Sequence, residues 1–313
     1  MINMNWNKKK ILVTGGNGFL GKNLISQLKD KDAEEIISPS SSEFDLRNDS
    51  NCKELVRDVD IVFHLAGRVG GIGFNQKYPG DVFYDNLMMG TQLLHESKEA
   101  NVEKFIGMGT VCSYPKFATI PFTEESLWDG FPEETNASYG LSKKMMIVQS
   151  QAYKQQYDFD SITLIPTNFY GPKDDFKPET SHVIPALILK FDQAMKNNSN
   201  EVVLWGDGTP SRDFLHIHDA ARGVILAAEK YNKFEPINLG SQIEVTIKEL
   251  ANKISKLMKF NGQITWDTSR PNGQPRRCVS FQKAKKEFGF EPEIDFNAGL
   301  KETIEWFHNN NKI

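Results

Sequence analysis

A strand, a glycine-rich turn and a helix follow one another near the start of the chain. Residues 10–14 are an apolar run that predicts a buried strand, and residues 22–28 have helical character. Between them stand Gly15, Gly18 and Gly21 in the spacing Gly-x-x-Gly-x-x-Gly. Glycines permit the tight turn and let the backbone approach a pyrophosphate, which then rests on the helix N-terminus. Ordinary turns also contain such glycines, but the flanking strand and helix predict dinucleotide binding.

Strands and helices continue to alternate over residues 10–170. This order predicts an α/β protein with a Rossmann-type, doubly wound parallel sheet. Past residue 170 the chain becomes polar and turn-rich, which indicates a crossing into a second unit. We therefore expect an NAD(P)-binding Rossmann domain at 1–170, to which about 213–242 returns, and a smaller C-terminal α/β substrate lobe at 171–313. The site should lie in the cleft between them.

The composition is that of an ordinary globular protein. The 313 residues are 39% hydrophobic and 25% charged, with a formal net charge of −4. This charge gives no broad attraction for nucleic acid or membrane surfaces. Cys52, Cys112 and Cys278 are too few and too scattered for a disulfide framework or a zinc site, so we expect no metal and a reducing compartment. The polar N-terminus and the lack of a long apolar run predict a cytoplasmic location.

The second strand, at residues 35–38, ends in serines rather than in a carboxylate. An NAD-specific site usually has an acidic residue there to bind the ribose 2′-hydroxyl, whereas this chain has Ser38 and then Pro39 and three more serines. A 2′-phosphate is therefore not repelled, and NADP(H) is favoured. NAD(H) stays open because no arginine is evident as a phosphate clamp. Asp45 and Leu46 follow, either as contacts for the adenine edge or as a helix N-cap.

A third strand at residues 60–64 leads into Leu65, Ala66 and Gly67, which would pass close under the cofactor. His64 lies inside this apolar run and is expected to be a core histidine. The glycines at positions 70, 71 and 73 predict a flexible loop rather than an ordinary connector.

Polar residues follow the apolar run 105–108, which predicts the end of a buried parallel strand. Thr110 and Cys112 are two positions apart and could both point into the cleft. Tyr139 and Lys143 are at i and i+4 of an expected helix and share one face. A lysine ammonium beside a phenol lowers the pKa of the tyrosine. Thr110, Tyr139 and Lys143 therefore predict a proton-transfer site, although Tyr-x-x-x-Lys by itself recurs by chance.

The second half of the chain contains a histidine and several arginines in distinctive surroundings. Residues 181–188 begin a helix with His182 near its N-terminus, and Arg212 follows the strand and turn that contain Trp205. The Pro/Gly loop 270–277 ends in Arg276 and Arg277. Two adjacent arginines suit a diphosphate, although a solubilising loop explains them equally well.

Together these motifs resemble the extended short-chain dehydrogenase/reductase family, whose members act on nucleotide-activated sugars. The glycine loop and Tyr139-x-x-x-Lys143 are generic to that family. More specific runs resemble its GDP-L-fucose synthase branch and cover nearly the whole chain: 64–72, 112–116, 166–172, 181–187, 205–212 and 270–276.

The resemblance implies 3,5-epimerisation of GDP-4-keto-6-deoxy-D-mannose and then NADPH-dependent reduction of its C4 ketone to give GDP-L-fucose. The catalytic residues implied are Thr110, Cys112, Tyr139, Lys143 and His182, with the base and acid roles of Cys112 and His182 left open. With the motifs above, the expected cofactor residues are Gly15, Gly18, Phe19, Leu20, Gly21, Ser38, Asp45, Leu46, Leu65, Ala66, Gly67, Tyr139, Lys143, Pro166, Asn168 and His182. The expected substrate residues are Asn168, Val183, Leu187, Trp205, Arg212 and Arg276.

Two departures from the branch leave the sugar open. The common Gly-Ser-Ser-Cys is here Gly109-Thr110-Val111-Cys112, and Gly140-Leu141-Ser142 is typical of the wider family. A reductase or a redox-neutral epimerase for another GDP-4-keto sugar, such as a colitose or deoxyheptose precursor, is the alternative. A non-catalytic dinucleotide sensor is disfavoured because Thr110, Tyr139 and Lys143 are all present. The resemblance also implies a homodimer through the helices near 88–97 and 139–153, which the sequence itself does not show.

Overall fold

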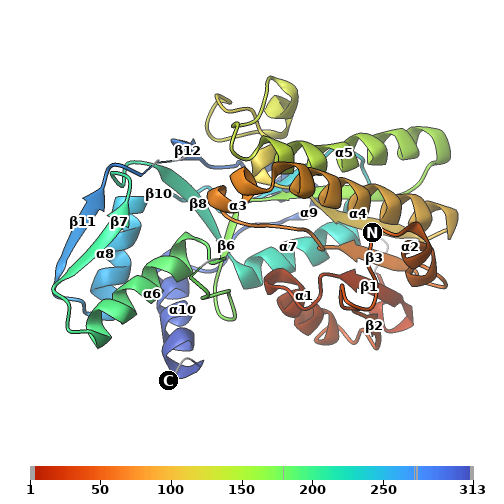
Figure 1. The fold of residues 1–313 in the computed structure, drawn as a ribbon. Coiled ribbons are helices and arrows are strands. Elements are labelled where there is room, and N and C mark those ends of the chain that lie inside the picture. Colours follow the sequence, from red (N-terminus) through yellow and green to blue (C-terminus); the bar gives the residue numbers. More distant parts are fainter. Residues whose placement is uncertain (1–3, 179, 271, 273, 311–313) are drawn as a thin grey trace.

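A computed structural model describes residues 4–178, 180–270, 272 and 274–310. Its centre is a six-stranded parallel sheet in the order β2-β1-β3-β4-β5-β9 (Figure 1). The strands of this sheet are β1 (Lys10–Thr14), β2 (Glu35–Ile37), β3 (Ile61–His64), β4 (Lys104–Met108), β5 (Ser161–Pro166) and β9 (Ile237–Leu239). The order reverses beside β1, where the chain crosses to the other half of the sheet. The predicted doubly wound α/β fold is confirmed.

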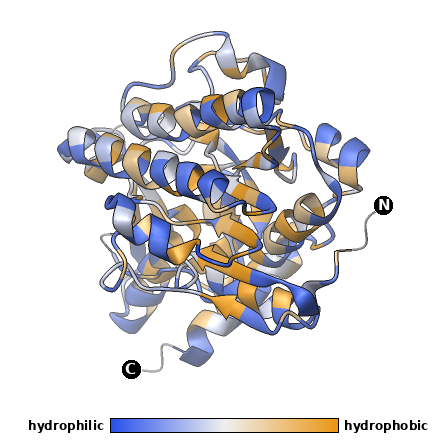
Figure 2. Ribbon diagram, turned by 90° about the vertical axis from the view of Figure 1, so that its right-hand side faces the viewer, coloured by the Kyte–Doolittle hydropathy of each residue, from blue (hydrophilic) through white to orange (hydrophobic). Residues whose placement is uncertain are grey.

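Helices cover both faces of this sheet, which explains why its strands are continuously apolar. Ile11 and Val13 belong to the core beneath α1 (Phe19–Lys29) and α7 (Ile217–Lys230). Leu12, between them, points the other way and packs with Leu93 of α4 (Pro79–Glu99) and Met146 of α5 (Ala137–Tyr157). Figure 2 shows mostly hydrophobic strands with helices around them that mix hydrophilic and hydrophobic residues. The remaining elements of this half are α2 (Asp49–Leu55), α3 (Ile72–Lys77), α9 (Gln282–Phe288) and the 3-10 turns η1 (Trp6–Lys8), η2 (Val111–Ser113) and η3 (Glu124–Trp128).

A second group of elements lies beside the carboxyl ends of these strands (Figure 1). It contains the sheet β10-β8-β12, with β6 paired to β8, and the pair β11-β7. Buried side chains of its three helices form a separate apolar core. The bounds are β6 (Asn168–Tyr170), α6 (Val183–Lys196), β7 (Glu201–Trp205), β8 (Ser211–His216), β10 (Glu244–Thr246), α8 (Ile247–Met258), β11 (Gln263–Asp267), β12 (Arg276–Arg277) and α10 (Phe296–Asn310).

The glycine-containing segment after β3 differs from the flexible loop that the sequence predicts. Residues Ile72–Lys77 form the short helix α3. The guanidinium carbon of Arg68 lies 5.5 Å from the centre of the Phe74 ring. The backbone N–H of Arg68 donates to Asn86 Oδ1 at 3.1 Å. The segment is therefore fixed at its start by this hydrogen bond and at α3 by the contact between Arg68 and Phe74. No helix among the described residues is both long and apolar enough to cross a membrane.

Candidate active site

The glycine turn between β1 and α1 is packed too closely for side chains. Gly15 has a φ of 72°, and a Cβ on it would lie 2.8 Å from the Ala66 nitrogen. A Cβ on Gly21 would lie 2.3 Å from the Gly15 oxygen. Gly18 precedes the first residue of α1, whose N-terminal N–H groups are free to bind an anion. Phe19 and Leu20 turn their side chains into the core below.

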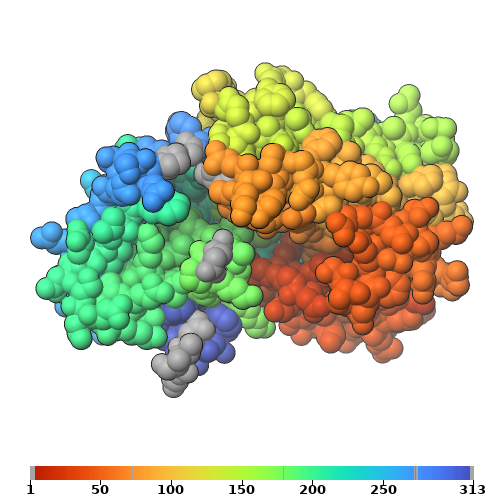
Figure 3. Space-filling model, in the orientation of Figure 1, coloured from red at the N-terminus to blue at the C-terminus, as the bar shows by residue number. Residues whose placement is uncertain are grey.

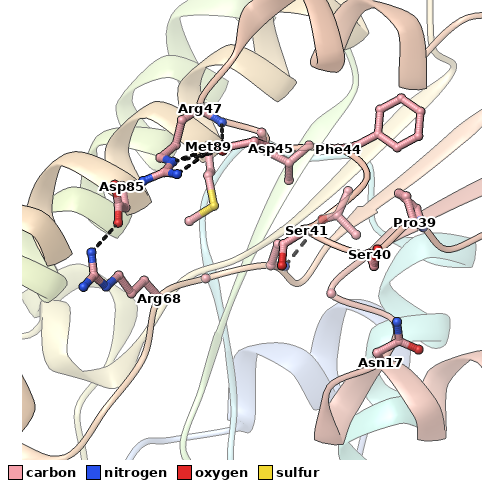
Figure 4. A pocket seen from close by; sticks show the side chains of 15 residues that line it. Asn17, Pro39, Ser40, Ser41, Phe44, Asp45, Arg47, Arg68, Asp85 and Met89 are labelled. Carbon is pink, nitrogen blue, oxygen red and sulfur yellow. Dashed lines mark hydrogen bonds and ion pairs between the residues drawn. The ribbon is translucent and has the colours of Figure 1, made fainter.

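This turn opens into a cavity of about 570 Å³ (Figure 4). Five of the predicted cofactor residues line it, from the ends of three neighbouring strands: Gly15, Asp45, Leu46, Ala66 and Gly67. Ser38 packs against the turn, because a Cβ on Gly16 would lie 2.0 Å from its Oγ. That Oγ is buried and has no hydrogen-bond partner among the described residues. A glycine cradle, a helix N-terminus and serine hydroxyls suit a dinucleotide diphosphate.

The cavity wall also contains two arginines that the sequence analysis did not assign (Figure 4). Arg47 Nε donates to Asp45 Oδ1 at 2.9 Å, and Arg47 Nη1 donates to Asp85 Oδ1 at 3.1 Å. Arg68 Nη1 donates to the other Asp85 oxygen at 2.7 Å. Burial raises the pKa of Asp85, but its bonds to Arg68 and Arg47 outweigh this, and its pKa is lowered. The pairing of Arg47 with Asp85, which is far along the chain, holds the Arg47 guanidinium in the cavity wall.

Thr110, Tyr139 and Lys143 come together at the end of β4 and the start of α5. Lys143 Nζ donates to the Ala66 carbonyl at 3.2 Å, and burial lowers the pKa of Lys143 to about 8. Burial also raises the pKa of Tyr139, with the nearby Cys112 adding to it and a hydrogen bond with Thr110 opposing it. The expected lowering of the Tyr139 pKa by Lys143 was therefore wrong for the protein alone. Tyr139 is held as a neutral phenol, which is a proton donor.

Cys112 lies next to this group because the chain turns sharply after β4. Thr110 Oγ1 accepts from the backbone N–H of Cys112 at 3.2 Å and caps the 3-10 turn η2. A Cβ on Gly140 would lie 2.3 Å from the Cys112 carbonyl oxygen, so this turn can pack onto α5 only where α5 has glycine. The thiol is free and partly accessible. Cys112 is among the groups that influence the pKa of Tyr139 and of Arg212, so it lies near both residues.

His182 and the other candidate residues after β5 belong to the second group of elements, and Figure 3 shows the surface hollowed beside that group. His182 directly precedes α6, and part of its surface is accessible to solvent. Desolvation by the surrounding protein nevertheless lowers the pKa of His182, and the negative charge of Asp175 opposes this shift. Asn168 Nδ2 donates to the Asp213 carbonyl at 2.9 Å, and Pro166 ends β5. Leu187 is buried and Val183 half-buried on α6, while Leu65 packs into the core beneath the sheet.

Arg212 and Arg276, which the sequence analysis grouped together, point to opposite faces of their sheet. Arg276 pairs in register with Ser211, whereas Arg277 pairs with Arg212. Arg276 Nε donates to Glu244 Oε1 at 2.8 Å in an exposed ion pair. Burial and then Arg277 lower the pKa of Arg212 to about 9. Arg277 is thus the residue that lies beside Arg212. The two-residue period of a strand predicts that Arg276 and Arg277 point to opposite faces, but only the register against β8 shows which of them meets Arg212.

Trp205 ends β7 with 65% of its surface exposed. The guanidinium carbon of Arg270 lies 5.2 Å from the centre of its ring. Of the basic loop predicted to hold a diphosphate, Pro271 and Gly273 lie outside the described residues. Within the part of the chain that is described, no group of three or more His, Cys, Asp or Glu side chains could hold a metal ion.

Comparisons with known proteins agree with this architecture. Residues 11–240 match the NAD dependent epimerase/dehydratase family. GDP-L-fucose synthase 1 of Arabidopsis thaliana is 36% identical over 303 residues, covering 96% of this chain and 94% of the relative. A GDP-6-OMe-4-keto-L-xylo-heptose reductase from C. jejuni has a TM-score of 0.91 at 26% identity, covering 97% of this chain and 99% of that one. A GDP-L-fucose synthetase from Naegleria fowleri bound to NADP has a TM-score of 0.86 at 30% identity, covering 97% and 95%. The chain belongs to the NAD-dependent epimerase/dehydratase family.

Proposed function

We propose that this protein converts GDP-4-keto-6-deoxy-D-mannose to GDP-L-fucose by epimerisation at C3 and C5 and NADPH-dependent reduction at C4. The observation that carries the proposal is the grouping of Thr110, Tyr139, Lys143 and Cys112 opposite Arg212. Relatives that are named GDP-L-fucose synthases and cover nearly the whole chain support the same substrate.

Tyr139 and Thr110 would serve the C4 ketone. The protons on C3 and C5 are α to that ketone, so removal of either leaves an enolate whose oxygen needs hydrogen-bond donors. The phenol of Tyr139 and the hydroxyl of Thr110 are such donors. Bound NADPH would supply the hydride for C4. Tyr139 would then donate the proton that completes the alcohol, and its raised pKa keeps that proton in place until it is needed.

Cys112 and His182 would exchange the protons at C3 and C5. Inversion of a carbon centre requires a base on one face and an acid on the other. Cys112 lies on the Tyr139 side and His182 begins the α6 wall of the other lobe, which fits two faces of one sugar. The lowered pKa of His182 favours its neutral form near pH 7, which can accept a proton.

The arginines of the second lobe would hold the GDP diphosphate. Arg212 Nη1 is already bonded to the carbonyls of Ser211 and Gln274, at 2.7 and 2.8 Å, which fixes the direction of its guanidinium. Arg277 adds a second cation on the same face. Two cations side by side are unfavourable by themselves, and a bound diphosphate would compensate both. Val183, Leu187 and Trp205 would line the nucleotide side.

The decisive experiment follows NADPH absorbance with purified protein and GDP-4-keto-6-deoxy-mannose, and identifies the product by NMR. Stoichiometric loss of NADPH with formation of GDP-L-fucose is expected. Loss of NADPH with an unepimerised product would leave a plain 4-ketoreductase. No consumption of NADPH would contradict the proposal.

A second candidate is a reductase for a different GDP-4-keto sugar. The high structural similarity to a C. jejuni enzyme named as a reductase of a GDP-keto-heptose favours it, as does Thr110-Val111 before the cysteine. Parallel assays with GDP-keto-heptoses separate the two, because the better substrate has the higher kcat/KM. A redox-neutral epimerase would convert substrate without net loss of NADPH.

We further propose a homodimer through α4 and α5 and a cytoplasmic location. Tyr84 and Val148 are exposed apolar side chains on these two neighbouring helices, with 56% and 43% of their surfaces accessible. Light scattering would measure the mass in solution. Cys52, Cys112 and Cys278 are free thiols, as a reducing compartment requires.

A further inference from the structure

The segment that leads into α3 runs along the face of α5 that carries the tyrosine. Its first anchor is the Ala66 carbonyl, which accepts from Lys143 Nζ at 3.2 Å. Its second anchor is Asn75 Nδ2, which donates to Asn136 Oδ1 at 3.0 Å. Asn136, Tyr139 and Lys143 are spaced by three and four residues, so they share one helix face. Tyr139 therefore lies between the two anchors, and Asn75 contacts Asn136 at the N-terminal end of α5.

A carboxylate fixes which way the two amides point. Glu133 Oε2 accepts from Asn136 Nδ2 at 2.9 Å and from Thr135 Oγ1 at 2.5 Å. Since a carboxylate only accepts, the nitrogen of Asn136 must face it and the oxygen of Asn136 must face Asn75. Of the two polar atoms of the Asn75 amide, the nitrogen must therefore face that oxygen and donate to it. The orientation of both amides follows from this chain of bonds.

One polar atom is left over at the end of the chain of bonds. Asn75 is 5% exposed, and its Oδ1 has no hydrogen-bond partner among the described residues. Buried acceptors in folded proteins are nearly always hydrogen-bonded, so we expect this oxygen to accept a hydrogen bond from a bound ligand. Arg68 packs against Phe74 of α3 and donates a hydrogen bond to Asp85. These contacts hold α3 in place and so fix the position of Asn75 Oδ1.

We infer that Asn75 is a sugar-specificity residue whose Oδ1 accepts a hydrogen bond from a ring hydroxyl of the keto-sugar lying against Tyr139. The inference rests on the proposed function, since that reaction requires the sugar at Tyr139. A hydroxyl on C2 or C3 is the donor that this sugar offers. Sites built to bond a hydroxyl discriminate strongly against analogues that lack it.

The test combines Asn75→Ala with substrates that lack the C2 or the C3 hydroxyl. On the parent keto-sugar the variant should lose about tenfold or more in kcat/KM, while its Kd for NADPH stays within about twofold. On one of the two deoxy analogues, wild type and variant should give the same kcat/KM within about twofold, because the contact is already absent. Gln76→Ala, on the exposed side of α3, is the matched control and should behave as wild type.

The outcomes separate the inference from the proposed function. A wild-type chain that leaves every keto-sugar unchanged contradicts the proposed function and, with it, the inference. An active wild type with an unaffected Asn75→Ala, or a variant that loses equally on all three substrates, overturns the inference alone. If the variant does not fold, the wild type by itself decides: equal kcat/KM for the parent and both analogues overturns the inference.

Discussion

Arg277 lies directly opposite Arg212 across the parallel pair β8-β12, so two cationic side chains share one face of the sheet. Arg277 contributes to the lowered pKa of Arg212, which shows that the two charges interact. Like charges opposite each other destabilise a sheet unless an anion lies between them. The position of this arginine pair therefore predicts the site of a diphosphate. It is a more specific indication than the basic composition of the loop.

Arg277→Leu should weaken GDP binding by about tenfold or more, since a charge-assisted contact is lost. Arg276→Leu is the matched control, because Arg276 is an equally basic neighbour that is paired with Glu244 on the opposite face. Its Kd for GDP should stay within about threefold of wild type. Isothermal titration with GDP measures both. A larger loss for Arg276→Leu would reverse the assignment.

Arg47→Leu should reduce the preference for NADPH over NADH by about tenfold, through a higher KM for NADPH. Arg47 lines the same cavity as Ser40 and Ser41, and its guanidinium could reach a 2′-phosphate bound there. Arg57→Leu, at an exposed position outside the cavity lining, serves as the control. Steady-state kinetics with each cofactor gives the ratio. An unchanged ratio would exclude Arg47 as the phosphate ligand.

Lys143→Met should remove a specific pH dependence of stability. The pKa of Lys143 falls from 10.5 to about 8 on folding because burial disfavours the charge. Between these values the unfolded chain binds more protons than the folded one, so the contribution of Lys143 to stability rises with pH. Wild type should therefore gain about 2 kcal/mol relative to Lys143→Met between roughly pH 7 and 9.5. Urea unfolding at both pH values measures it, and parallel pH curves would contradict it.

Cys112→Ser should separate the two halves of the proposed reaction. Exchange of the C3 and C5 protons with solvent deuterium should fall by about a hundredfold or more, because a serine hydroxyl is a poor substitute for a cysteine in proton transfer, either as acid or as base. Reduction at C4 should persist, since Tyr139 and Lys143 are unchanged. NMR of the sugar in deuterium oxide follows both steps. Full exchange in the variant would remove Cys112 from the proton-transfer role.

Tyr139→Phe should slow reduction strongly while leaving cofactor binding intact. Loss of the phenolic proton removes the acid that completes the alcohol, a loss of about a hundredfold or more in kcat. Fluorescence titration with NADPH checks that the site is still formed. A variant that turns over at the wild-type rate would require another acid.

The features predicted correctly from the sequence are local ones. The strand β1, the turn at Gly15 and the helix α1 each depend on residues that are neighbours in the chain. The sequence pattern of those residues therefore predicts all three. Alternation of such units constrains the sheet to be parallel and doubly wound, because parallel strands need helical crossovers on both faces. The i, i+4 spacing likewise places Tyr139 and Lys143 on one helix face before any tertiary contact is known.

The sequence by itself thus determined the fold class, the glycine cradle and the shared face of Tyr139 and Lys143. Only the tertiary structure decided which cations and amides come together. The register of β12 against β8 put Arg277 rather than Arg276 beside Arg212, and Asp85 on α4 brought Arg47 to the cavity wall. It also raised the pKa of Tyr139, where the sequence predicted a lowering, because the desolvation produced by packing exceeds the effect of the Thr110 hydrogen bond. Such contacts depend on long-range registration and burial, which no local pattern of residues encodes.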